Sequence, residues 1–231
     1  MPDQQLIEEG KIYKKRLLLS LIIPGIIVFF MWIVKVIEVL FGIDLSGLGI
    51  YPLNLKGIPG IVLSPLIHAN FKHLTDNTLP LFLLSVSLFF FYREIALKIF
   101  SFTWISTGIL VWLGGRPAWH IGASGLVYGL ASFLFFSGII RKYYRLIGLS
   151  LLVVFLYGEM VWGIFPDIYK SVSWESHMLG VFSGILLAII YRKQGPQEPV
   201  KIWIEEDEDN DEDSEMYGKG TETDYEKKEG T

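Results

Sequence analysis

Long apolar stretches alternate with short polar or glycine-rich segments along most of the chain. Each stretch approaches the length that a helix needs to cross about 30 Å of hydrocarbon. The pattern therefore predicts an all-α membrane protein with six spanning helices, at residues 17–40, 71–92, 98–113, 124–140, 146–164 and 174–191.

The first predicted helix is retained rather than cleaved. Its apolar run is longer than the core of a signal peptide, and no small-residue cleavage site follows it. Pro24 lies inside it, which a membrane helix tolerates. Lys35 and Glu38 are three residues apart near its far end, so we expect their side chains to pair.

The connection between the first two helices, residues 42–67, is apolar but interrupted. Gly57, Pro59, Gly60 and Pro65 break its hydrophobic pattern. Such residues end helices and favour turns. We therefore expect a structured loop that lies partly in the membrane interface.

The composition agrees with a membrane protein. Hydrophobic residues make up 52% of the 231 residues, and the mean hydropathy is +0.44. A soluble domain of this length would not need so much apolar surface. The chain has no cysteine, which excludes disulfides, thiol catalysis and thiolate metal sites.

The formal net charge of −4 conceals two different parts. Residues 205–231 hold 13 of the 24 acidic residues and 3 of the 20 basic ones, which leaves a net charge of +6 on the remainder. A highly charged segment with little to bury is typical of disorder. We expect a cytoplasmic N-terminal segment at 1–16, a six-helix domain at 17–193 and an acidic, disordered cytoplasmic tail at 194–231.

The basic residues at the helix ends predict the orientation of the six helices. One set of flanks holds eleven of them: Lys11, Lys14, Lys15, Arg16, Arg93, Lys98, Arg141, Lys142, Arg145, Arg192 and Lys193. The other set holds four: Lys56, Lys72, Arg116 and Lys170. This asymmetry places both termini in the cytoplasm and the starts of the second, fourth and sixth helices on the outer side.

A serine stands where a glycine-rich loop becomes the fourth helix. Ser124 lies among Gly122, Gly125 and Gly129. The start of a helix presents free N–H groups to developing negative charge, so this is a useful position for a nucleophile. The alternative interpretation is a glycine-rich turn that a serine caps.

Small residues form matching stripes on the fourth and sixth helices. On the sixth helix Gly180 and Gly184 share a face with His177 and leave a small surface beside its ring, and on the fourth helix Gly125 and Gly129 are four residues apart. Small-residue stripes let membrane helices approach closely. They predict that these two helices pack together and bring Ser124 Oγ within reach of the His177 ring, although ordinary helix packing would produce the same stripes.

The chain's histidines gather near the outer ends of the predicted helices, at His68, His73, His120 and His177. Ionisable groups at membrane depth are costly and usually functional. A neighbouring histidine could take the proton of a serine nucleophile, and the resulting oxyanion would need hydrogen-bond donors. His73 and Asn77 share one helix face and could donate, although a polar helix start would look the same. We expect His68 to anchor a loop and His120 to be loop structure.

These residues resemble the motifs of the rhomboid intramembrane serine proteases. Residues 122–125 read Gly-Ala-Ser-Gly, which is similar to the family's GxSG motif. The run from His177 through Gly180 to Gly184 resembles its sixth-helix motif, and the spacing of His68, His73 and Asn77 resembles its second-helix pattern. The resemblance covers about residues 50–190 and implies a six-helix rhomboid-like bundle.

The resemblance also implies roles for individual residues. Ser124 would be the nucleophile and His177 the general base, in a dyad without an acid. The oxyanion hole would use His73, Asn77 and the backbone N–H of Ser124. Tyr128 matches a tyrosine that stacks on the base, and the polar cluster would double as a hydrated cavity.

The resemblance further implies what the protein acts on and where. Substrates would be single-span transmembrane proteins, cleaved within or beside their helix near the outer membrane face. We expect a lipid bilayer around the protein, with no cofactor, no metal and no nucleic-acid partner. A bacterial plasma (inner) membrane is the expected location.

Some positions depart from the family's pattern. Ser176 replaces the usual alanine before the sixth-helix histidine but is still small, and a Trp-Arg pair common in the first loop is absent from residues 42–67. Asp76 either faces lipid headgroups or favours particular substrate side chains. We expect Glu159, in the fifth helix, to lie near the outer interface.

Other classes of membrane protein fit less well. The chain has no HExxH zinc motif and no visible pair of apposed membrane aspartates. A transporter would show a pair of broken, inverted-repeat helices, and none is evident. The remaining alternative is a catalytically inactive rhomboid-like protein that binds membrane clients as a scaffold.

Overall fold

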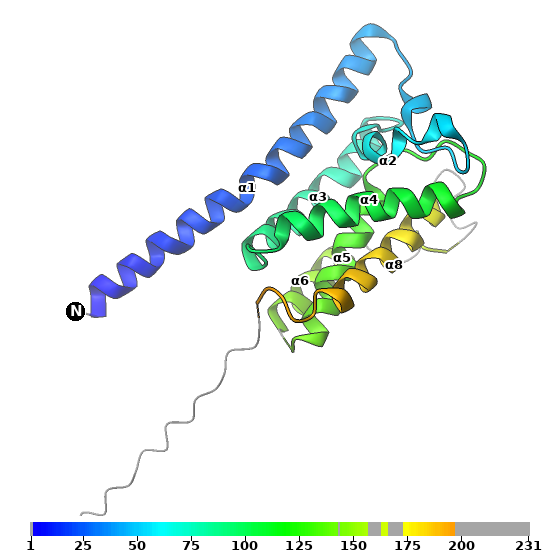
Figure 1. The fold of residues 1–231 in the computed structure, drawn as a ribbon. Helices are drawn as coiled ribbons and strands as arrows, with labels where there is room; N and C mark the ends of the chain where they lie inside the picture. The colour runs from blue at the N-terminus through cyan, green and yellow to red at the C-terminus, as the bar shows by residue number, and fades with distance from the viewer. Residues whose placement is uncertain (1, 143, 157–162, 166–172, 197–231) are drawn as a thin grey trace, which may run out of the picture. The chain divides into compact units, whose positions relative to one another are not determined.

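The computed structural model describes residues 2–142, 144–156, 163–165 and 173–196. Within these ranges the chain is helical and contains no β-strand, as the sequence predicts; an isolated antiparallel bridge pairs Ile50 with His120. The helices are α1 (Pro2–Phe41), η1 (Ser46–Leu48), η2 (Leu55–Gly57), α2 (Gly60–Leu63), η3 (Ser64–Leu66), α3 (Phe71–Phe91), α4 (Ala96–Gly114), α5 (Ser124–Ile140), α6 (Tyr144–Leu156) and α8 (Trp174–Ile190) (Figure 1).

Three of the described helices are long and apolar enough to cross a membrane: Gly10–Phe41 within α1, all of α3, and all of α4. α5 and α8 are also apolar and have 17 residues each. At 1.5 Å per residue each would be about 25 Å long, close to the lower limit for a spanning helix.

α1 begins much earlier than its apolar pattern. The structure has it start at Pro2, whereas the hydrophobic run predicts a helix only from Leu17. Proline suits the first position of a helix, and the glutamines, glutamates and lysines that follow are good helix formers. The helix therefore continues beyond the part that hydrophobicity alone can detect.

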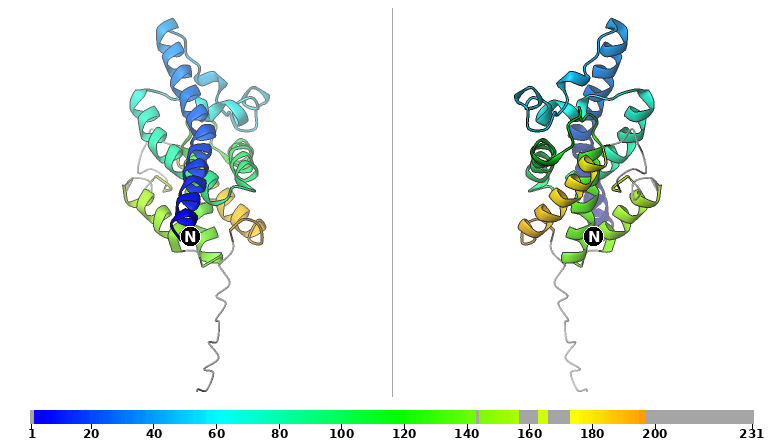
Figure 2. Two further views of the ribbon diagram at one scale, coloured as in Figure 1. Left: turned by 90° about the vertical axis from the view of Figure 1, so that its left-hand side faces the viewer. Right: turned by 90° about the vertical axis from the view of Figure 1, so that its right-hand side faces the viewer.

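α5 lies at the centre of the bundle. It packs against α8, α6, α3 and α4, and most of its residues are buried. A helix that is apolar on every side is suited to such an enclosed place. Figure 2 shows α1 along one side of the bundle and α8 on the opposite side.

The crossing of α5 and α8 is built from facing glycines. A Cβ atom on Gly180 would collide with the backbone carbonyl of Gly125, and one on Gly184 would collide with the carbonyl of Gly129. The Ser132 hydroxyl bridges the crossing by donating to the carbonyl of Val181 at 3.0 Å. The two backbones therefore approach more closely than they could if these positions carried side chains.

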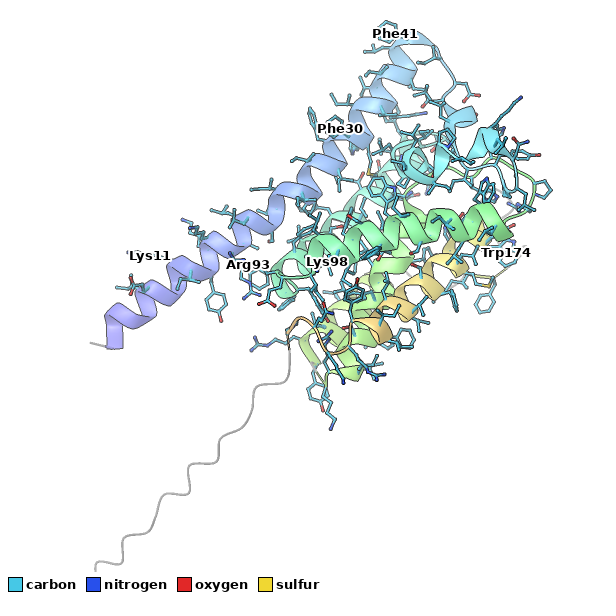
Figure 3. All side chains as sticks on the ribbon, viewed as in Figure 1. Lys11, Phe30, Phe41, Arg93, Lys98 and Trp174 are labelled. Carbon is cyan, nitrogen blue, oxygen red and sulfur yellow. The ribbon has the colours of Figure 1, made fainter. Side chains whose placement is uncertain are left out.

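α1 is attached to α3 at separate levels. The Trp32 indole N–H donates to Thr78 Oγ1 at 3.1 Å, and Arg16 Nε donates to the carbonyl of Phe90 at 2.7 Å. Apolar side chains on the outer side of α1, among them Phe30 and Phe41, project away from the bundle (Figure 3). Their exposure fits a surface that faces lipid.

A buried arginine fastens the far end of α5. Arg141 donates to Ser137 Oγ at 2.8 Å, to the carbonyl of Tyr191 at 2.6 Å and to that of Pro196 at 3.0 Å. Tyr92 also donates to Ser137 Oγ, at 2.8 Å. This cluster ties the ends of α3, α5 and α8 together at the opposite end of the bundle from Ser124.

The glycine crossing predicts that an added methyl group would separate α5 from α8. Gly180→Ala should lower the midpoint of thermal unfolding in detergent, because overpacking costs about 1–3 kcal/mol. Gly25→Ala in α1 is the matched control, since a Cβ atom there meets nothing within 4 Å. The control should leave the midpoint unchanged or raise it; equal losses in the two variants would contradict the prediction.

Candidate active site

Ser124 is the first residue of α5, and the loop before it requires glycine. Gly122 has a φ of +105°, and a Cβ atom there would lie 2.6 Å from Cε1 of the His73 ring. The Gly122 N–H donates to the carbonyl of Ser64 at 2.9 Å. The first glycine of the Gly-Ala-Ser-Gly run therefore brings the imidazole of α3 close to the loop that carries Ser124.

The structure brings Ser124 and His177 into hydrogen-bonding contact across the α5–α8 crossing. Ser124 Oγ lies 2.8 Å from His177 Nε2. His177 Nδ1 lies 2.8 Å from the backbone carbonyl of Gly163. A carbonyl can only accept, so Nδ1 carries the proton, and Nε2 presents a lone pair to the serine hydroxyl. This is the tautomer that a general base requires.

The ring of Tyr128 packs flat against one face of the His177 ring. The two ring centroids are 4.1 Å apart and the planes differ by 14°, which is a stacked arrangement. Tyr128 lies one helical turn after Ser124, so a single helix supplies both the hydroxyl and the ring that packs on its partner. Rotation of the imidazole out of line with Ser124 would break both the stack and the bond to Gly163.

The carbonyl of Gly163 is a site component that the sequence reasoning missed. A Cβ atom at this position would collide with the Tyr128 hydroxyl and lie 3.0 Å from His177 Nδ1. Glycine is therefore the residue that fits beside the two stacked rings. A backbone acceptor has no side chain to mark it, and a lone glycine after a tryptophan is the only signal that the sequence offers.

His73 and Asn77 both lie in the first turns of α3. The Asn70 side chain caps this helix by accepting the His73 N–H at 2.8 Å. Asn77 is buried, and its Nδ2 donates to the carbonyl of His73 at 2.8 Å. An amide NH₂ carries two hydrogens, so this bond within the helix engages one of them. The structure thus places His73 against the Ser124 loop and Asn77 one turn further along.

His68 anchors the loop, as the sequence analysis expected. Its Nε2 accepts the backbone N–H of Ala123 at 3.4 Å, and its ring meets that of His73 edge-on, with centroids 5.0 Å apart. Burial, reinforced by the neighbouring His73, lowers the pKa of His68 from 6.5 to about 3. The ring is therefore neutral at ordinary pH and can serve as an acceptor.

His120 belongs to a polar network that fixes the start of α8. Its Nε2 donates to the carbonyl of Arg116 at 3.0 Å, and its Nδ1 accepts from Ser173 Oγ at 2.6 Å. Ser173 Oγ also lies 2.7 Å from Ser176 Oγ and accepts the Ser176 N–H at 3.3 Å. The buried Glu175 adds an ion pair to Arg116 at 3.4 Å. Together these contacts hold the helix that carries His177.

A small hollow lies beside the glycines of the serine loop. Polar side chains line part of it, namely Ser64, Thr107, His120 and Ser176. Within the described ranges, no three His, Asp or Glu side chains converge closely enough to hold a metal ion. Glu159, Lys170 and the acidic tail beyond residue 196 lie outside the described residues.

Comparison with known proteins identifies similar chains. The family described as the rhomboid domain matches residues 57–194. An uncharacterized protein of Mycobacterium bovis and one of Mycobacterium tuberculosis are each 34% identical over 169 residues, covering 69% of this chain and 70% of the relative. An uncharacterized protein of Mycobacterium leprae is 32% identical over 169 residues, covering 69% of this chain and 66% of its own length.

The buried His68 predicts a pH-dependent stability. Its pKa is about 3 in the folded protein against 6.5 for an ordinary histidine, so the unfolded chain takes up the proton first as pH falls. The contribution of His68 to stability is complete above pH 6.5 and is lost as pH falls from 6.5 toward 3. Between about pH 7.5 and 4.5 the wild type should lose roughly 3 kcal/mol more stability than His68→Phe, because two pH units separate 4.5 from the unfolded pKa of 6.5.

Thermal unfolding in detergent measures this difference across the same pH range. Groups other than His68 titrate in both proteins, so only the difference between the two pH slopes is informative. Parallel slopes would show that His68 titrates in the folded state as it does in the unfolded chain.

Proposed function

This chain belongs to the rhomboid family, and on that premise we propose that it is an intramembrane serine endopeptidase. The observation that carries the proposal is the 2.8 Å contact between Ser124 Oγ and His177 Nε2, with Nδ1 held by the Gly163 carbonyl. A serine becomes a useful nucleophile only when a base can take its proton. The site supplies that base in the required tautomer.

The proposed reaction is acyl transfer to Ser124 followed by hydrolysis. His177 Nε2 takes the hydroxyl proton as Oγ attacks the carbonyl carbon of the scissile peptide. The C–N bond then breaks, and the imidazolium gives the proton to the leaving nitrogen. Water then attacks the acyl carbon while His177 Nε2 takes its proton. The bond from that carbon to Ser124 Oγ breaks, the imidazolium returns the proton to Oγ, and the second product is released as a carboxylic acid. The stack on Tyr128 and the bond to Gly163 keep Nε2 aimed at the reacting atoms throughout.

The proposed oxyanion hole uses the His73 side chain, the Asn77 side chain and the backbone N–H of Ser124. The contact of His73 with Gly122 supports this assignment, because it brings the ring beside the serine loop. Asn77 has a second amide hydrogen in addition to the one given to the carbonyl of His73. The N-terminus of α5 adds the positive end of a helix dipole at the same place.

The proposed topology has six spanning helices and both termini in the cytoplasm. α1, α3, α4, α5 and α8 would be five of the spans. The remaining one, expected from the sequence at 146–164, includes most of α6, and its residues 157–162 lie outside the described residues. Lys11, Arg93 and Lys98 lie toward one end of the bundle and Trp174 toward the other (Figure 3). The eleven-to-four bias of basic flanking residues assigns the first end to the cytoplasm.

The proposed domain boundaries and partners follow from this topology. We propose that the protease domain covers residues 17–193, between the N-terminal segment at 1–16 and an acidic C-terminal segment that starts at 194 and lies outside the described residues from 197 onward. Substrates are single-span membrane proteins, reached from the lipid bilayer and cleaved near its outer face without a cofactor or nucleic acid. The mycobacterial relatives support a bacterial plasma membrane. An inactive scaffold is the alternative, and the Ser124–His177 contact favours the enzyme.

Replacing either member of the dyad tests the proposal. Ser124→Ala and His177→Ala should abolish cleavage of a single-span reporter protein in liposomes, and Ser124→Ala should also abolish labelling by a serine-directed fluorophosphonate. His73→Ala and Asn77→Ala should each slow cleavage by roughly a hundredfold, the effect of one lost oxyanion donor. Ser101→Ala, at an exposed serine of α4, should cleave normally. Full activity in Ser124→Ala would refute the assignment.

The absence of cysteine from the sequence allows a direct test of the proposed topology. Lys56→Cys should react with a membrane-impermeant maleimide on intact cells, because the loop after α1 is assigned to the outer side. Lys98→Cys, at the start of α4, should react only after the membrane is permeabilised. Labelling of Lys98→Cys on intact cells would reverse the orientation.

A further inference from the structure

A buried cation near the outer end of α1 makes contacts that the proposed mechanism does not use. The side chain of Lys35 is only 8% exposed. Its Nζ donates to Glu38 Oε2 at 2.8 Å, to the carbonyl of His68 at 3.0 Å and to that of Ala69 at 3.1 Å. An ammonium group has three hydrogens, so these three acceptors satisfy it completely.

The two carbonyls lie directly before the helix that carries the proposed oxyanion residues. Ala69 is followed by Asn70, whose side chain caps α3 by accepting the N–H of His73. The ring of His68 accepts the N–H of Ala123, the residue before Ser124. Lys35 therefore binds the segment of residues 68–70. From this segment the His68 ring contacts the loop before Ser124, and the Asn70 side chain contacts the backbone of His73.

Glu38 completes the anchor on the side of α1. One carboxylate oxygen accepts from Lys35, and the other accepts the backbone N–H of Leu45 at 3.2 Å. The pair is thus held by the chain after α1 as well as by α1 itself. The Trp32–Thr78 and Arg16–Phe90 contacts join α1 to α3 independently of the pair, so α1 should stay docked when the lysine is replaced.

We propose that Lys35 is a positioning residue for the oxyanion hole. By holding the carbonyls of His68 and Ala69 it sets where α3 begins, and so where His73 stands relative to Ser124. This role rests on the proposed protease function. Displacement of a catalytic group by about 1 Å can slow an enzyme by a hundredfold. Buried charges in membrane proteins are energetically costly and are usually functional.

Four variants separate this role from simple helix docking and from charge neutralisation. Lys35→Met removes the three donors at similar length. Trp32→Phe removes one hydrogen bond between α1 and α3 but leaves Lys35 bound to the carbonyls of His68 and Ala69. Glu38→Gln removes the negative charge and leaves one oxygen, which can take the place of only one of the two that accept from Lys35 and Leu45. Lys35→Met/Glu38→Gln avoids the uncompensated carboxylate that Lys35→Met alone would leave buried, which could otherwise destabilise the protein.

Steady-state cleavage of the single-span reporter in liposomes gives kcat and KM for each variant. Lys35→Met and the double variant should lose kcat by roughly tenfold to a hundredfold at similar KM. Trp32→Phe should stay within about threefold of the wild type. Glu38→Gln should lose less kcat than Lys35→Met, because Lys35 still donates to the carbonyls of His68 and Ala69. Recovery of kcat in the double variant would overturn the proposal, because the lysine would then only neutralise Glu38. A loss in Trp32→Phe equal to that in Lys35→Met would overturn it as well.

A double-mutant cycle tests whether Lys35 acts through His73. In a His73→Ala background, Lys35→Met should cost less than about twofold, since the group that it places is already absent. If the loss of kcat in the double variant equalled the product of the losses in Lys35→Met and His73→Ala, the two residues would act independently and the proposal would be contradicted.

Amide hydrogen exchange over residues 70–77 gives a readout that does not depend on activity. Exchange there should accelerate in Lys35→Met and not in Trp32→Phe; unchanged exchange in Lys35→Met would overturn the positioning role. A wild-type protein that neither cleaves the reporter nor reacts with fluorophosphonate would instead overturn the protease function itself. An active wild type with an equally active Lys35→Met overturns only the role of Lys35.

Discussion

The close approach of α5 and α8 is the constraint on which the site depends. Ser124 and His177 belong to different helices, and their side chains are short. Contact at 2.8 Å is possible because Gly180 has no Cβ atom, which would collide with the Gly125 carbonyl, and because a Cβ atom on Gly125 would already be tight against Ser176. In a membrane, where apolar side chains gain little by leaving lipid for protein, such close packing is a main source of helix association. The same glycines therefore stabilise the fold and set the geometry of the proposed dyad.

Around this crossing, hydrogen bonds between buried polar groups hold the loops and helix starts in place, while His68 Nδ1 and Thr107 Oγ1 have no hydrogen-bond partner within the described residues. His120, Ser173 and Ser176 hold the start of α8, while His68 and Lys35 hold the loops before α5 and α3. Each unpaired polar group at this depth would cost several kcal/mol. The networks consequently resist rearrangement, and the proposed reaction would use this preorganisation to stabilise the charge of its transition state.

Much of this arrangement can be predicted from the sequence, and the limits have a physical cause. The small-residue stripes identify the α5–α8 contact, and Lys35 pairs with Glu38 at 2.8 Å as their spacing indicates. Hydrophobicity locates the helices but misses the first turns of α1, which are polar yet helical. The partners supplied by Gly163, His68 and Ala69 are backbone carbonyls. Every residue has such a group, so only the three-dimensional path of the chain shows which ones are used.

The Gly163 carbonyl illustrates a wider consequence. Where a side-chain acid orients a histidine, a single substitution can delete the acid and expose its contribution. Here the acceptor belongs to the main chain and survives every replacement of residue 163. A saturation screen would therefore record steric damage at this position but never the value of the hydrogen bond. Only chemistry that alters the peptide group, such as an ester in place of the amide after Gly163 to weaken its carbonyl as an acceptor, could reveal how strongly the imidazole relies on it.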